Sequence, residues 1–237
     1  MFRTIIWFIN FTITLVASTP RMIKYKSLIK AGKEREAYEY AHKIVASWSL
    51  KQVKMAGAEV KVYGEENLLK DETVLYVSNH QGNFDIPIIL SYIDAPKGFI
   101  AKLETKKIPI VRTWMEYINC VFMDRSNLRK SAEAIALGIR KLKAGYSMVI
   151  FPEGTRSKGG PIGEFKAGSF KLATKPKVPI IPITIKGSYK LMEERGNKIT
   201  PGTVEVFIHP AIYTDGLSRE EIEALPKKVQ DIIGNML

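Results

Sequence analysis

The sequence contains a single cysteine and only three histidines, and this scarcity excludes several kinds of protein. One cysteine, Cys120, cannot form an internal disulfide framework. The histidines His42, His80 and His209 have no short ligand spacing, so we expect no zinc site and no other bound metal. Cys120 stands in the apolar run 118–122, where we expect a thiol packed inside a strand and not a nucleophile.

Acidic residues are also few relative to basic ones. The chain has 24 aspartates and glutamates against 36 lysines and arginines, a net charge of +12. Residues 1–58 alone carry ten basic residues against three glutamates, a net charge of +7. Such an excess fits an anionic membrane surface, a phosphorylated substrate or nucleic acid. Nucleic acid is not an expected partner, because aromatic residues do not interleave with the basic ones and no helix-turn-helix or zinc-finger spacing occurs.

The apolar, uncharged stretch at residues 4–17 is shorter than the ~20 residues that a helix needs to cross a bilayer comfortably. With Arg3 before it and small residues at Ala17 and Ser18, it also has the pattern of a secretory signal. A basic run at 21–33 follows at once and would hold the segment at an anionic, cytoplasmic face. The segment after it looks like a partner helix, which favours an uncleaved anchor.

Residues 34–56 are predicted to form one long amphipathic helix. Its apolar residues recur at three- and four-residue spacing: Ala37, Ala41, Ile44, Val45 and Trp48. An apolar segment, a basic turn and an amphipathic helix together are typical of an interfacial anchor, and the alternative is a helix that packs on the main domain. We therefore expect residues 1–58 to be a monotopic anchor on the cytoplasmic face of the inner or plasma membrane, followed by a domain at 59–237.

The periodicity changes after this helix, and short apolar, β-branched runs alternate with helical patterns. The predicted strands lie at 60–63, 74–78, 98–101, 120–123, 147–151, 178–185 and 204–208. Helices are predicted at 86–92, at 131–143 with Gly145 ending it, and after a capping box formed by Ser218 and Glu221. This alternation indicates an α/β fold with a central mixed, largely parallel sheet covered by helices.

Polar residues follow four of the predicted strands directly. They are His80, Lys102, Arg125, and Glu153 with Arg156. Ligands of open α/β sheets bind beyond the carboxyl ends of the strands, so we expect these side chains to converge on one site.

His80 is followed by Asp85 after four intervening residues. An imidazole can take a proton from a hydroxyl near neutral pH, and a carboxylate on its other nitrogen would fix the tautomer. No serine or cysteine nucleophile is evident, so the hydroxyl to be activated would belong to the substrate. The alternative is a loop histidine beside a helix-capping aspartate.

Four segments together resemble the motifs of the glycerophospholipid acyltransferases, in particular the lysophosphatidate branch. They are the histidine–aspartate motif at 79–85, the arginine motif at 122–125, Phe-Pro-Glu-Gly-Thr-Arg-Ser at 151–157 and the proline-bearing motif at 178–182. Order and spacing agree with the family, over about half of the chain. Gly82 is a departure, because members of this branch often have serine there.

The resemblance implies transfer of a fatty acyl group from a thioester, on acyl carrier protein or coenzyme A, to the free hydroxyl of 1-acylglycerol-3-phosphate. The product would be phosphatidate, an intermediate of phospholipid biosynthesis, and no cofactor beyond the thioester co-substrate is expected. His80 and Asp85 would be catalytic. The expected substrate-binding residues are Lys102, Arg125, Glu153, Gly154, Thr155 and Arg156.

Some alternatives stay open at this point. The acceptor could be glycerol-3-phosphate or another lysolipid, or the chain could be a non-catalytic lipid-binding protein on the same scaffold. Glu153 could bind a glycerol hydroxyl or hold the arginines by ion pairing. Arg125 and Arg156 could instead form surface ion pairs with Asp124 or Glu164.

Overall fold

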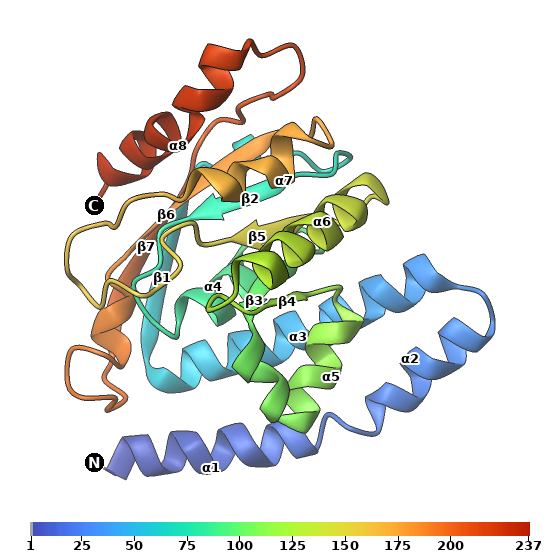
Figure 1. Cartoon of the computed structure of the whole chain (residues 1–237). Coiled ribbons are helices and arrows are strands. Elements are labelled where there is room, and N and C mark those ends of the chain that lie inside the picture. Colours follow the sequence, from blue (N-terminus) through green and yellow to red (C-terminus); the bar gives the residue numbers. More distant parts are fainter. Residues whose placement is uncertain (1) are drawn as a thin grey trace.

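The computed structural model describes residues 2–237 and contains one seven-stranded sheet (Figure 1). The strand order is β1-β7-β6-β2-β5-β3-β4. The strands are β1 (Ala58–Tyr63), β2 (Leu75–Ser78), β3 (Gly98–Lys102), β4 (Val121–Met123), β5 (Met148–Ile150), β6 (Ile180–Lys186) and β7 (Gly202–Ile208). Every neighbouring pair is parallel except β6 and β7. The predicted mixed, largely parallel sheet is thus confirmed.

Helices cover the sheet on both faces. The α-helices are α1 (Phe2–Val16), α2 (Arg21–Lys30), α3 (Glu34–Ala56), α4 (Asp85–Tyr92), α5 (Pro109–Tyr117), α6 (Leu128–Lys143), α7 (Lys171–Thr174) and α8 (Arg219–Gly234), and of these α1 and α2 pack on α3. The predicted capping box is present at the start of α8, and Gly145 follows α6 with a positive φ of 86°. Helix α6 begins earlier than predicted because the side chain of Asn127 caps it, and no helix was predicted at α5.

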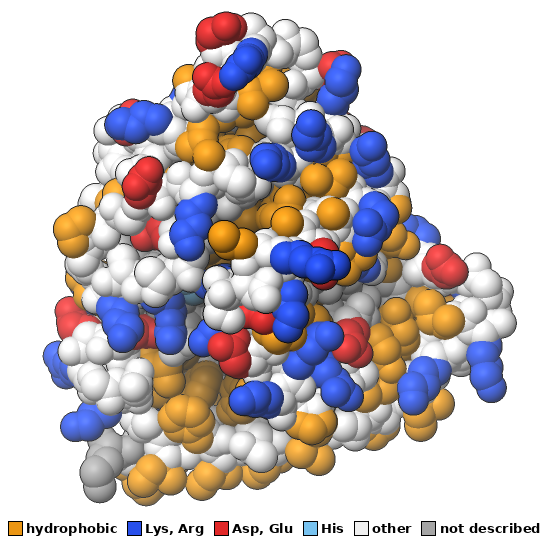
Figure 2. Space-filling view, viewed as in Figure 1, with side chains coloured by type: hydrophobic (Ala, Val, Ile, Leu, Met, Phe, Trp, Pro, Cys, Tyr) orange, Lys and Arg blue, Asp and Glu red, His pale blue; other side chains and the backbone are white. Residues whose placement is uncertain are grey.

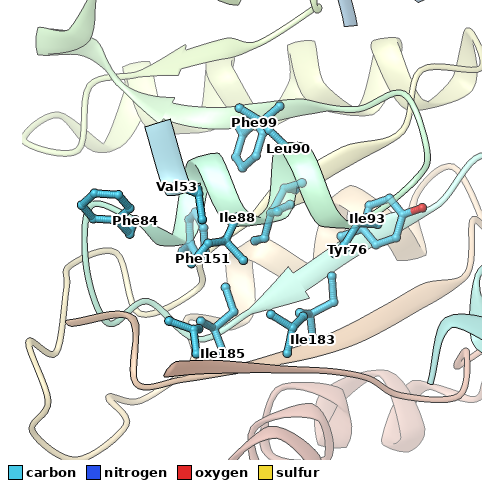
Figure 3. Close-up of a cluster of buried hydrophobic side chains, with 14 of the residues drawn as sticks. Val53, Tyr76, Phe84, Ile88, Leu90, Ile93, Phe99, Phe151, Ile183 and Ile185 are labelled. Carbon is cyan, nitrogen blue, oxygen red and sulfur yellow. The ribbon is translucent and has the colours of Figure 1, made fainter. Parts of the chain in front are cut away.

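Side-chain alternation along β2 divides the core into two layers. Leu75 and Val77 pack with residues of α6, α7 and α8, whereas Tyr76 packs with residues of α3 and α4. Figure 3 shows the second layer, a single buried cluster that includes Val53 of α3, Ile88 of α4 and Ile183 of β6. Each such fully buried aliphatic side chain contributes about 1.5–3 kcal/mol to folding, which fixes the sheet between its two helical layers.

The N-terminal segment contains the two predicted helices, α1 and α3. The basic run between them was expected to be a turn, and it forms the additional helix α2. Ala37, Ala41 and Val53 on α3 are fully buried, because this face packs on α4 (Figure 1). For this helix the packing alternative is therefore observed. The division of the chain at residue 58 stays a prediction.

Helix α1 has an exposed apolar face. Its exposed residues are Phe2, Ile5, Ile6, Phe8, Ile9, Ile13 and Val16, and Figure 2 shows hydrophobic side chains along this lower edge of the molecule. Trp7 is its one buried residue, and Trp7 Nε1 donates a hydrogen bond of 3.0 Å to the Gln52 carbonyl of α3. By length and composition the stretch Phe2–Lys30 could cross a membrane, although a turn at 17–20 divides it into α1 and α2.

A buried lysine joins α3 to the end of α4. Lys97 Nζ donates hydrogen bonds of 2.6 Å to the carbonyls of Ile93 and Ala95, and lies 3.5 Å from His42 Nε2 on α3. Burial, and secondarily the charge of Lys97, lowers the pKa of His42 to about 3. His42 is therefore neutral in the folded protein at every pH near physiological.

This burial predicts a pH-dependent loss of stability. His42 has a pKa of 6.5 when unfolded and about 3 when folded, so below pH 6.5 the unfolded chain binds a proton that the folded chain does not. The His42 contribution is complete above pH 6.5, and ~2 kcal/mol of it should be lost by pH 5. Denaturant unfolding in detergent at pH 7.5 and pH 5 should show a smaller acid-induced loss for His42→Gln. Equal losses in both proteins would contradict this effect.

Candidate active site

The four predicted polar strand ends converge at one edge of the sheet. β2, β5, β3 and β4 are adjacent and parallel, so His80, Glu153, Lys102 and Arg125 all emerge at the same edge. A cavity of about 500 Å³ opens there. Six of the eight predicted site residues line it, namely His80, Lys102, Arg125, Gly154, Thr155 and Arg156. Asp85 and Glu153 lie behind them.

His80 and Asp85 form a hydrogen-bonded pair. His80 Nδ1 lies 2.6 Å from Asp85 Oδ2, and the imidazole stacks on the Phe151 ring with centroids 4.1 Å apart. The His80 side chain is 13% exposed, whereas that of Asp85 is fully buried. A carboxylate accepts hydrogen bonds only, so the Nδ1 proton points to Asp85 and Nε2 is the nitrogen that can take a proton. The pair therefore has the arrangement of a general base and its orienting acid.

Asp85 is held in place by further donors. Its Oδ2 also accepts the backbone N–H groups of Gln81 (2.7 Å) and Gly82 (2.9 Å), and its Oδ1 accepts the Ser188 hydroxyl. Asp85 is the first residue of α4, where the helix dipole favours a negative charge. These contacts hold the buried carboxylate in place. The carboxylate in turn fixes the orientation of the His80 imidazole.

Glu153 supports the His80 loop from behind. Its Oε1 accepts the His80 backbone N–H at 2.6 Å, and its Oε2 accepts the Gly163 N–H at 2.8 Å. Burial raises the pKa of Glu153, and the two backbone donors oppose that rise. Both oxygens have backbone partners, and within residues 2–237 Glu153 makes no ion pair with Arg125 or Arg156. The observed role is thus structural support, and its predicted contact with substrate stays a prediction.

The loop after Glu153 runs alongside the His80 loop. The Ser157 N–H donates to the His80 carbonyl at 2.8 Å, and the Lys158 N–H to that of Gln81 at 3.1 Å. The backbone N–H groups of residues 80–83 all donate to the carboxylates of Glu153, Asp85 and Glu193. Across the described residues, the N–H groups of Thr155 and Arg156 donate to no protein acceptor. They are therefore available as backbone donors for a ligand.

Two arginines stand at the mouth of the cavity with fixed partners. Arg125 Nη1 donates to the Gly154 carbonyl, and Arg156 Nη1 donates to Asn83 Oδ1 and, at 3.3 Å, to Glu193 Oε1. Asp124 pairs with Lys130 at 3.5 Å and not with either arginine. Lys102 is exposed and pairs with Glu104 at 3.1 Å. Arg125, Arg156 and Lys102 thus place three cationic side chains along the cavity, two of them paired with glutamates.

The interior of the cavity is apolar. Beyond His80 it is lined by Leu15, Ile44, Val45, Trp48, Leu90, Phe99, Val111, Trp114, Met115, Ile118, Cys120 and Phe151. Cys120 is buried as predicted, and burial raises its thiol pKa to about 12, so it is neutral. Leu15 belongs to α1 and Trp48 to α3, so the N-terminal helices form part of the wall.

The sequence did not mark the end of β6 and the segment after it, which hold the loop at 79–83. Asn79 exchanges two hydrogen bonds of 2.8 Å with the backbone of Ile185, and Gln81 Oε1 accepts the Gly187 N–H at 2.8 Å. Ser188 and Glu193 follow on the same segment. They lie more than a hundred residues from the loop that they contact, and no local pattern marks them.

The family model described as Acyltransferase matches residues 59–186. A probable 1-acyl-sn-glycerol-3-phosphate acyltransferase of Mycoplasma pneumoniae is 32% identical over 78% of this chain and 69% of its own length. One of Borreliella burgdorferi is 33% identical over 76% and 72%. A chloroplastic enzyme of that name from Brassica napus is 39% identical over 64% of this chain, which spans only 44% of that relative's length.

A solved structure is similar along nearly the whole chain. The crystal structure of the 1-acyl-sn-glycerophosphate (LPA) acyltransferase from Thermotoga maritima superposes with a TM-score of 0.86 at 32% sequence identity, covering 99% of this chain and 93% of that one. The family model covers more than half of the chain and includes His80, Asp85, Arg125, Glu153 and Arg156. This protein belongs to the acyltransferase family.

Proposed function

We propose that this acyltransferase moves a fatty acyl group from a thioester to the free hydroxyl of 1-acylglycerol-3-phosphate, forming phosphatidate. One observation carries the proposal: the His80–Asp85 pair opens into an apolar cavity whose mouth holds Arg125 and Arg156. A base for a hydroxyl, cations for a phosphate and room for acyl chains thus occur in one site. The similarity to enzymes named for this reaction supports the same acceptor.

In the proposed reaction His80 Nε2 takes the proton of the acceptor hydroxyl while that oxygen attacks the thioester carbonyl. The buried Asp85 carboxylate stabilises the imidazolium that forms. The tetrahedral intermediate then collapses, the C–S bond breaks, and the imidazolium returns the proton to the leaving thiolate. The backbone N–H groups of Thr155 and Arg156 are the candidates to stabilise the oxyanion, because those of residues 80–83 are already engaged.

The polar and apolar parts of the cavity have separate roles in this proposal. Arg125 and Arg156 bind the acceptor phosphate, for which planar guanidinium groups suit two oxygens at once, and Lys102 adds a point charge. The interior binds acyl chains at about 0.8 kcal/mol per buried methylene. The donor can be an acyl carrier protein or coenzyme A thioester, and an assay offering each one separates them.

The exposed face of α1 supports a membrane-bound enzyme. Both the lysophosphatidate acceptor and the phosphatidate product reside in a bilayer, and Leu15 of α1 lines the cavity. The apolar face would enter one leaflet, with the basic residues of 21–33 at anionic headgroups. We propose a monotopic attachment to the cytoplasmic face of the inner or plasma membrane.

The reaction and its base are tested together. Purified protein in detergent should acylate lysophosphatidate in preference to glycerol-3-phosphate and other lysolipids. His80→Ala should reduce transfer to background, and Asp85→Asn should cost several orders of magnitude, as the corresponding change costs about 10⁴ in a serine protease triad. Near-normal turnover in folded His80→Ala protein would refute the mechanism. Lipid binding by the wild-type protein without transfer from either thioester would indicate a binding protein.

The arginines should act on the acceptor. Arg125→Ala and Arg156→Ala each remove a charge-assisted contact, so the KM for lysophosphatidate should rise about tenfold or more while the KM for the thioester changes little. Arg129→Ala is a matched control, because the Arg129 side chain is 91% exposed and pairs with Glu133 on the same helix. Steady-state kinetics with each substrate varied separately provide the measurement. A rise confined to the thioester KM would reverse the assignment.

Membrane attachment is tested on the exposed residues of α1, because deletion of 1–58 would remove the buried face of α3. Substitution of Ile5, Ile9 and Ile13 together by serine leaves the buried Trp7 in place. Co-sedimentation with anionic phospholipid vesicles should fall about tenfold or more, given ~25 cal/mol per Å² of apolar surface. Leu128→Ser, at a residue 90% exposed on α6, is the control. Unchanged sedimentation of the triple variant would exclude α1 as the anchor.

A further inference from the structure

Glu193 is a buried carboxylate that contacts two residues of the cavity wall, Asn83 and Arg156, and it has no role in the reaction described above. It lies just after the short helix η4 (Ser188–Leu191), and its side chain is 2% exposed. Its Oε1 accepts the Asn83 backbone N–H at 2.8 Å and Arg156 Nη1 at 3.3 Å. One oxygen therefore joins the catalytic loop to an arginine of the cavity mouth.

Gly82 provides the space that this carboxylate occupies. A Cβ atom at position 82 would lie 2.5 Å from Glu193 Oε2, closer than such atoms approach, and 3.0 Å from Glu193 Cδ. Oε2 is itself buried and has no hydrogen-bond partner within residues 2–237. Burial of an unpaired carboxylate oxygen destabilises a fold, so Glu193 is held there at a cost in stability.

The contacts of Arg156 are all on one nitrogen. Nη1 donates to Asn83 Oδ1 and to Glu193 Oε1, and in the described part of the chain Nη2 and Nε donate to no protein acceptor. The two fixed acceptors restrict a long side chain that is 36% exposed. The Nε and Nη2 edge is left for a ligand, and this edge can bind two oxygens of a phosphate.

We propose that Glu193 is a positioning residue that orients Arg156 toward the acceptor phosphate, and that Gly82 is required at its position because any side chain there displaces Glu193. This inference rests on the proposed function. It couples residues 82 and 193, so that a larger residue at 82 is tolerated only when the carboxylate of Glu193 is removed.

The first experiment compares Glu193→Ala and Glu193→Gln in detergent, with lysophosphatidate and thioester varied separately. Glu193→Ala removes both hydrogen bonds, so the KM for lysophosphatidate should rise about tenfold with little change in kcat or in the thioester KM. Glu193→Gln retains an oxygen acceptor and should stay within about threefold of the wild type. The neighbouring Glu194→Ala is the control, because Glu194 is exposed. A defect that was only structural would lower kcat and the folded fraction together and would not be confined to the lysophosphatidate KM.

The second experiment tests the coupling and does not depend on the folding of Glu193→Ala alone. Gly82→Ala in the wild-type background should raise the lysophosphatidate KM about tenfold, as displacement of Glu193 does. The same change added to Glu193→Ala, or to Glu193→Gly if the alanine variant does not fold, should add less than about twofold.

The possible outcomes separate this inference from the proposed function. If the wild-type protein does not acylate lysophosphatidate, the proposed function fails. If the wild type does so and Glu193→Ala behaves like Glu194→Ala, only the role of Glu193 is refuted. An equal effect of Gly82→Ala in both backgrounds refutes the coupling, and a rise confined to the thioester KM refutes the assignment to the acceptor.

Discussion

The buried Asp85 carboxylate is the contact on which the site depends. It accepts hydrogen bonds from His80 Nδ1, from two successive backbone N–H groups and from the Ser188 hydroxyl. This one carboxylate thus shapes the loop after β2, begins α4 and fixes the proton on His80 Nδ1. A buried carboxylate is stable when hydrogen-bond donors surround it, and the Ser188 hydroxyl, which supplies one of them, joins the loop to the segment after β6.

Glu153 and Glu193 extend the same principle to the rest of the loop. Together with Asp85 they accept hydrogen bonds from the four successive N–H groups of residues 80–83, so three carboxylates satisfy one stretch of irregular backbone. These three carboxylates lie close together although the protein has a net charge of +12. Within residues 2–237, Glu193 pairs with Arg156, whereas Asp85 pairs only with the His80 imidazole and Glu153 pairs with no cation. The arginines remain at the mouth, separate from Glu153.

Much of the fold could be predicted from the sequence, because strands buried on both faces leave continuous apolar runs and helix ends carry caps such as Ser218 with Glu221. The convergence of His80, Lys102, Arg125 and Glu153 followed from parallel pairing alone. Helix α2 was predicted as a turn because of its basic residues, although Met22, Tyr25 and Ile29 recur at helical spacing. Glu193 and Ser188 could not be found, since their partners are about a hundred residues away in the chain. The support role of Glu153 depends on its hydrogen bond from the His80 backbone N–H, and a sequence motif does not reveal such a contact.

The presence of Leu15 in the cavity wall has a consequence for how the enzyme meets its acceptor. Helix α1 is joined to the domain through Trp7 and closes one side of the cavity, while its other side carries the exposed apolar residues. In the proposed arrangement the acceptor diffuses laterally in the leaflet and enters beside α1 without passing through water. Its effective concentration is then a mole fraction at the surface, so diluting lysophosphatidate with inert lipid slows the enzyme, whereas diluting the vesicles in buffer does not.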